Sequence, residues 1–85
     1  MAESLPAITG KQLIRLLQRD GWVHGGMRTH GIALRKRFED RTRVTIVPNK
    51  RTSLPDGTLG DILGARQTGL GRVGLLALIE LHGLK

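Results

Sequence analysis

The side chains best suited to move protons near neutral pH are the three histidines, His24, His30 and His82. An imidazole titrates close to physiological pH, so it can act as a general base and then as a general acid. His82 falls in the last turn of a predicted helix, where a protonated ring favours the helix dipole, and nothing singles out His24. His30 opens the most basic part of the chain. We therefore expect His30 to be the catalytic residue of an enzyme, with a local hydrogen bond as its alternative role.

Basic residues gather around and after His30. From Arg28 to Arg51 the chain has eight basic and two acidic residues, which accounts for +6 of its net charge of +7. A segment this basic is a candidate for contacts to phosphate groups. The predicted RNA-binding residues are Arg28, Thr29, Arg35, Lys36, Arg37, Arg41, Arg43, Lys50 and Arg51. A basic surface that serves only solubility is the alternative.

Cleavage of RNA would need few groups beyond these. A general base takes the proton of a ribose 2′-hydroxyl, the oxygen attacks the adjacent phosphorus, and cations stabilise the charge that develops. Because the nucleophile belongs to the substrate, the reaction requires no serine, cysteine or metal ion. The sequence thus favours a metal-independent ribonuclease among the enzyme classes.

Other kinds of site find little support in the sequence. The chain has no cysteine, and its histidines lack the spacings typical of metal ligands, so we expect neither a metal nor another cofactor. Ser4 and Ser53 have no visible His–Asp support for a nucleophile. With one Trp, one Phe and no Tyr, the chain also lacks the aromatic platforms on which many single-strand binders stack bases.

Local sequence signals predict the elements that position these residues. Residues 9–12 have the form of a capping box and start a helix over 10–20, with Gly21 as its C-terminal stop. Trp22 and Val23 begin a short strand that loosens at Gly25 and Gly26. Residues 31–38 and 42–47 alternate in polarity and predict a hairpin. A capping pattern at 58–61 predicts a short helix, and residues 73–82 predict a final helix that is buried.

The alternation also predicts two faces of a sheet. We expect the inward side chains to be Ile32, Leu34, Phe38, Val44 and Ile46. Arg35, Arg37 and Arg43 then share the outer face. The predicted fold class is α+β: helix, three antiparallel strands, helix and an additional C-terminal helix, in one domain over residues 9–85. Residues 1–8 are expected to form a flexible tail.

The chain shows no signal for a membrane. Its longest apolar stretch, from Val73 to Leu81, is about half the length of a membrane span, and the first seven residues do not resemble a signal peptide. We therefore expect a soluble, cytoplasmic protein with a polyanionic partner.

Four segments recur together in one known family. They are residues 10–17 (GKQLIRLL) ended by Gly21-Trp22, then Thr29-His30, then 44–48 (VTIVP), and finally 54–63 (LPDGTLGDIL). In this order and over roughly residues 9–70, the chain resembles the HicA-type mRNA interferase toxins of bacterial and archaeal toxin–antitoxin pairs. The last of the four segments is the most specific.

The resemblance implies a double-stranded-RNA-binding-like fold, metal-independent cleavage of mRNA, and inhibition by a HicB-type antitoxin. The catalytic histidine of the family falls on His30. Two departures leave room for altered activity: Arg28 replaces a glycine, and Gly31 stands where many members have a second histidine. The C-terminal segment from Gly69 onward is also longer and more apolar than the usual tail, and Val73–Leu81 within it is a candidate for self-association or antitoxin contact.

Two functions of other classes stay open. The first is a non-catalytic RNA-binding module that uses the same basic sheet. Ordinary double-stranded-RNA-binding domains carry lysines at the start of their last helix, whereas residues 55–61 contain two acids and no lysine, which weakens this alternative. The second is an adaptor that binds only an acidic protein. RNA binding that vanishes at modest salt would favour the adaptor.

Overall fold

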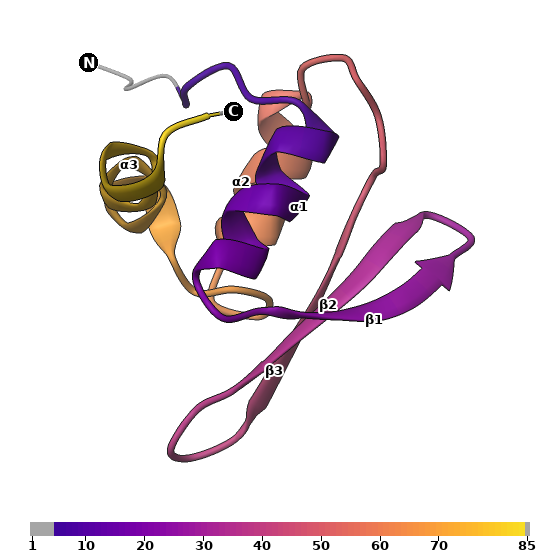
Figure 1. Ribbon diagram of the computed structural model, residues 1–85, viewed down its shortest axis with the longest axis vertical. Coiled ribbons are helices and arrows are strands. Elements are labelled where there is room, and N and C mark those ends of the chain that lie inside the picture. Colours follow the sequence, from indigo (N-terminus) through magenta and orange to yellow (C-terminus); the bar gives the residue numbers. More distant parts are fainter. Residues whose placement is uncertain (1–4, 85) are drawn as a thin grey trace.

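The fold is that of an α+β domain with one antiparallel sheet (Figure 1). The computed structural model describes residues 5–84. Its elements are α1 (Gly10–Arg19), β1 (Val23–Arg28), β2 (Gly31–Arg37), β3 (Thr42–Val47), α2 (Asp56–Leu63) and α3 (Gly71–His82). The sheet order is β1-β2-β3, with both neighbouring pairs antiparallel. The predicted order of one helix, three strands, one helix and an additional C-terminal helix is confirmed.

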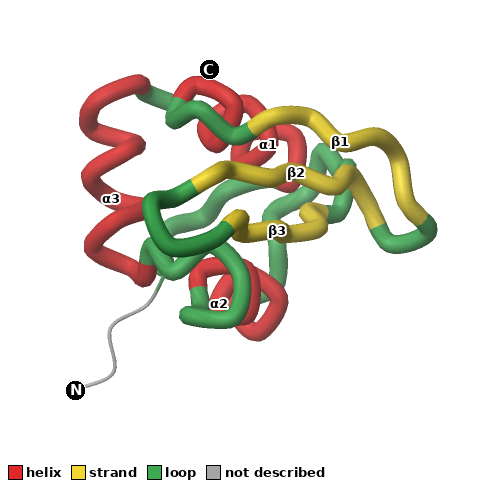
Figure 2. The backbone as a smooth tube through the Cα atoms, turned by 90° about the horizontal axis from the view of Figure 1, so that it is seen from below, coloured by secondary structure: helices red, strands yellow, loops and turns green. Residues whose placement is uncertain are grey.

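The helices cover one face of the sheet and leave the other open (Figure 2). Contacts join α1 to β2 and β3, and α2 to β3, while α3 packs against α1 and α2. The buried core lies between these layers, and its fully buried side chains include Ile8, Leu13, Leu17, Leu34, Val47, Leu59 and Leu75. Ile8 and the half-buried Leu5 belong to this core, although both fall in the predicted tail; residues 1–4 of that tail lie outside the described residues.

The ends of α1 follow the local sequence. Thr9 Oγ1 accepts the Gln12 backbone N–H at 3.0 Å, and Gln12 Oε1 accepts the Thr9 N–H at 3.0 Å. This is the predicted capping box, which satisfies two amides of the first turn. The helix stops before Gly21, whose φ of 99° is available to glycine at little cost.

The helices after the sheet depart from the sequence prediction at two points. α2 begins at Asp56, not near Thr58: Pro55 is its N-cap residue, outside the helix, and Asp56 in the first turn favours the positive end of the helix dipole. α3 is not buried all round. Val73 and Leu81 have 78% and 74% of their surface exposed, although the helix is held to the core by Leu75 and Leu78.

The structure corrects the predicted orientation of β3. Val44 and Ile46, expected to point inward, lie on the open face with 52% and 39% of their surface exposed. Thr45 and Val47 are buried instead, and Arg43, expected on the outer face, shares their side of the strand. β-Branched side chains occupy both sides of the alternation in β3, so hydrophobicity alone cannot choose between the two faces.

Hydrogen bonds to the segment after α2 explain this orientation. Arg43 Nη1 donates to the carbonyl oxygens of Ala65 at 2.6 Å and Gln67 at 3.2 Å. Thr45 Oγ1 donates to Gln67 Oε1 at 2.5 Å. With Arg43 and Thr45 turned inward, the backbone oxygens of Ala65 and Gln67 and the side-chain oxygen of Gln67 each accept a hydrogen bond.

Candidate active site

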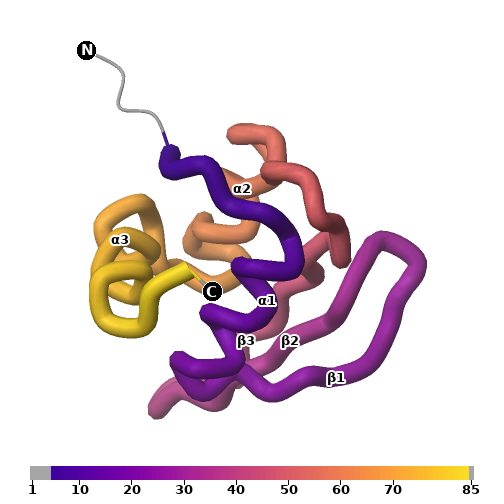
Figure 3. Tube along the Cα trace, turned by 45° about the horizontal axis from the view of Figure 1, so that its top comes forward, coloured from indigo at the N-terminus to yellow at the C-terminus, as the bar shows by residue number. Residues whose placement is uncertain are grey.

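His30 lies at the tip of the β1–β2 hairpin. The backbone pairing of Arg28 with Gly31 leaves Thr29 and His30 as the two residues of the turn. The hairpin extends away from the three helices (Figure 3). β1 is bulged between His24 and Met27, as the glycines at 25 and 26 predict, and the bulge lies in the strand that leads to the tip. His30 is therefore presented to solvent by two paired strands.

An open groove of about 600 Å³ runs beside His30. One wall is the hairpin tip and the other is the chain that leaves β3. The residues that line the groove are Met27, Arg28, Thr29, His30, Gly31, Pro48, Asn49 and Lys50. Three of the predicted RNA-binding residues, Arg28, Thr29 and Lys50, are thus brought together with His30.

Two close backbone contacts fix the geometry of this groove. Gly31 has a φ of 148°, and a Cβ at this position would overlap the Val47 carbonyl group. Gly10, the first residue of α1, abuts the Pro48 carbonyl oxygen in the same way. The Lys11 N–H also donates to the Lys50 oxygen at 3.0 Å. The segment that leaves β3 is therefore clasped between the hairpin tip and the start of α1.

The His30 imidazole is available for chemistry. Its side chain is exposed and lines the groove, and within residues 5–84 no hydrogen bond or ion pair engages it. His24, by contrast, uses Nδ1 to accept the Gly26 N–H at 3.1 Å. A local hydrogen bond was the alternative role predicted for His30. In this structure it is the His24 side chain that makes such a bond.

Two cations flank His30 on opposite walls. Arg28 is exposed and reaches back along its own strand, with Nη1 3.4 Å from the Met27 oxygen. Lys50 is exposed on the other wall. Cations on both sides of a groove can neutralise a phosphodiester held between them. The groove can therefore combine proton transfer with charge stabilisation.

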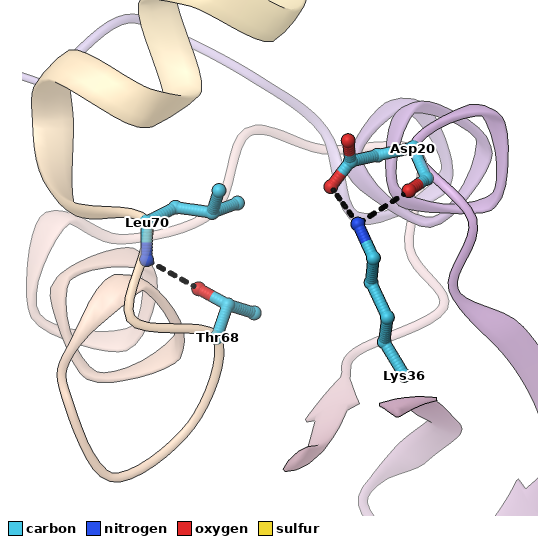
Figure 4. Close-up of polar contacts among 4 residues, drawn as sticks. All are labelled: Asp20, Lys36, Thr68 and Leu70. Carbon is cyan, nitrogen blue, oxygen red and sulfur yellow. Dashed lines mark hydrogen bonds and ion pairs between the residues drawn. The ribbon is translucent and has the colours of Figure 1, made fainter. Parts of the chain in front are cut away.

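Lys36 and Arg43 have roles inside the fold. Lys36 Nζ donates to the Asp20 backbone oxygen at 2.7 Å and to Asp20 Oδ2 at 3.2 Å, where α1 ends (Figure 4). The Lys36 Nζ and Arg43 Cζ atoms also lie 5.4 and 5.6 Å from the centre of the Phe38 ring. These contacts stabilise the fold, and the RNA contact predicted for the two residues stays a prediction.

The other predicted cations lie away from His30. Arg35 and Arg37 are exposed along β2, and Arg37 is at the opposite end of that strand, about 20 Å from the hairpin tip at the usual rise per residue. Arg41 is exposed in the β2–β3 turn and Arg51 in the loop after β3. The basic segment is therefore spread over the length of the hairpin, and only part of it surrounds the groove.

Sequence reasoning missed four residues at the groove or beside it: Lys11, Met27, Pro48 and Asn49. Met27 has 75% of its surface exposed, and no feature of its sequence neighbourhood indicates that it lines a groove. Lys11 and Asn49 meet through a contact between the start of α1 and the end of β3. Their positions, 38 residues apart, give no local signal for this contact.

Within residues 5–84, no three His, Asp or Glu side chains form a group that could hold a metal ion. In the same part of the chain, no helix has the length and apolar character to cross a membrane.

Comparison of the chain with protein-family models, with curated proteins and with solved structures found no match.

Proposed function

We propose that this chain is a metal-independent endoribonuclease, and the toxin of a toxin–antitoxin pair of the HicA type. One observation carries the proposal: an exposed histidine that has no hydrogen-bond or ion-pair partner within residues 5–84 lines an open groove between two cations, on a backbone held by close contacts. The family resemblance of residues 9–70 supports the same function. It also supplies the proposed substrate, mRNA, and the proposed inhibitor, a HicB-type antitoxin.

The proposed mechanism is an intramolecular displacement within the RNA. His30 takes the proton of a ribose 2′-hydroxyl, and the resulting oxyanion forms a bond to the adjacent phosphorus. Arg28 and Lys50 stabilise the negative charge on the phosphoryl oxygens. The bond from phosphorus to the 5′-oxygen breaks, and that oxygen takes up the proton from His30. The products are a 2′,3′-cyclic phosphate and a free 5′-hydroxyl end.

The remaining exposed arginines have a proposed role in binding. Arg35, Arg37, Arg41 and Arg51 contribute phosphate contacts away from the reacting bond. Such contacts raise affinity without sequence preference and weaken as salt rises. The proposed site of action is the cytoplasm, where mRNA is found.

Cleavage is expected to continue in an excess of EDTA and to leave 2′,3′-cyclic phosphate ends. His30 and the two cations supply every group that the displacement requires, so removal of divalent ions should not lower the rate. The measurement is cleavage of a labelled RNA by dialysed protein, with the ends of the products identified by mass spectrometry. Loss of activity in EDTA that Mg²⁺ restores, or products with 3′-hydroxyl ends, would contradict the mechanism.

A further inference from the structure

A second hollow adjoins the His30 groove on the surface of α1. Its lining residues are Lys11, Ile14, Arg15, Gln18 and Asn49. Asn49 lines both this hollow and the groove, so the two adjoin at this residue. Among the lining residues only Ile14 is apolar, and it is buried. The surface that a ligand would meet is therefore polar and basic.

A hydrogen bond fixes the Asn49 amide between the two hollows. Lys11 Nζ donates to Asn49 Oδ1 at 3.0 Å. An ammonium group can only donate, so the amide must present its oxygen to Lys11 and keep its NH2 group for another acceptor. In the described part of the chain, no residue accepts a hydrogen bond from this NH2 group. Asn49 thus offers two donor hydrogens at the junction of the hollows.

The exposed side of α1 continues the polar surface. Lys11, Arg15 and Gln18 are spaced by four and three residues, which places them on one side of a helix. They extend about 10 Å along the helix axis at the usual rise per residue. The bond from the Lys11 N–H to the Lys50 oxygen and the close approach of Gly10 to Pro48 hold this side of α1 against one wall of the groove. These contacts connect the helix that carries the second hollow to the wall of the first.

We propose that RNA continues from the His30 groove across Asn49 onto this side of α1, where Lys11 and Arg15 contact phosphates and Asn49 and Gln18 donate hydrogen bonds. This inference rests on the proposed ribonuclease function and adds a second substrate-binding arm to it. All of these residues except Asn49 lie outside the basic segment 28–51. Adjacency to the groove and the polar lining favour RNA over an apolar protein surface as the occupant.

The test measures RNA binding by a protein that cannot cleave. In the His30→Gln background, binding of a fluorescein-labelled, unstructured single-stranded RNA is titrated at several salt concentrations. Replacement of Lys11 and Arg15 by glutamine is expected to weaken binding and to reduce the slope of log Kd against log salt by about 1.4, since each phosphate contact on single strands contributes about 0.7. The matched control is Arg66→Gln, which removes an exposed cation outside both hollows and should leave the slope unchanged.

A second variant tests the junction. Asn49→Asp keeps an acceptor for Lys11, so the fold should be preserved, but it replaces the donor NH2 group with a negative charge. It is expected to weaken RNA binding without lowering the melting temperature. If the Lys11 and Arg15 replacement leaves both affinity and slope unchanged while the parent binds RNA, the α1 arm is wrong and the ribonuclease proposal stands. Equal losses in the Arg66 control would also contradict a specific arm. A parent that does not bind RNA would overturn both proposals.

Discussion

Replacement of His30 by alanine is expected to reduce RNA cleavage by about 10²–10⁴-fold, the usual contribution of general acid–base catalysis. The imidazole is the candidate acid–base group of the groove, since the other described side chains that line it include the cations Arg28 and Lys50 and no carboxylate. The variant should also lose the ability to arrest growth. The measurement is the rate of RNA cleavage under single-turnover conditions.

The fold of this variant should be unaffected, because the His30 side chain is exposed and makes no hydrogen bond within residues 5–84. RNA binding should also survive, because Arg28 and Lys50 remain. His24→Ala is the matched control: it removes an exposed histidine from the same hairpin and should cleave at nearly the wild-type rate. Cleavage retained by a pure His30→Ala sample would contradict the assignment. RNA binding by a wild-type protein that never cleaves would favour the non-catalytic RNA-binding module.

Substitution of Gly31 is expected to cause a large loss of stability. Gly31→Ala places a Cβ where the Val47 carbonyl group lies, and it forces an L-residue to a φ of 148°. Backbone strain and overpacking each cost about 1–3 kcal/mol, so a loss of about 3 kcal/mol is expected. For a domain of this size that corresponds to a decrease of about 12–24 °C in the melting temperature. Calorimetry or circular dichroism would measure it.

Gly31→His bears on the resemblance to the HicA-type toxins, many of which have a second histidine after the catalytic one. In this chain the larger side chain should be at least as destabilising as alanine, because the obstacle is the main chain of β3. Gly60→Ala is the control, and it should change the stability in the opposite direction. It adds a Cβ within α2 that meets no atom within 4 Å. It should stabilise the protein by about 0.5–1 kcal/mol. A melting temperature unchanged by Gly31→Ala would contradict the close approach.

The elements could be predicted from sequence where the signal was local. The capping box at Thr9 and Gln12, the stop at Gly21 and the bulge at Gly25 and Gly26 each involve neighbouring residues. The inner face of β3 could not be predicted in this way. It is decided by hydrogen bonds from Arg43 to a segment more than twenty residues later, which no alternation of polarity encodes.

In the candidate site, too, local sequence signals predict some residues, and contacts between distant segments decide the others. His30 and Arg28 are close in sequence, and their proximity follows from the hairpin. Lys50 reaches the groove only because Gly31 and Gly10 let the main chain after β3 pass close to both the hairpin and α1. The number of basic residues between Arg28 and Arg51 also overstates the basic surface that is open to RNA, because Lys36 and Arg43 make hydrogen bonds inside the fold.

The most direct measurement is cleavage of an RNA in which the ribose at the cleaved position lacks only its 2′-hydroxyl. If His30 activates an oxygen that belongs to the RNA, wild-type protein should bind this substrate but leave the modified position intact, while it cleaves the unmodified RNA there. Cleavage of the modified position at the normal rate would mean that water is the nucleophile, and it would contradict the mechanism proposed for the groove.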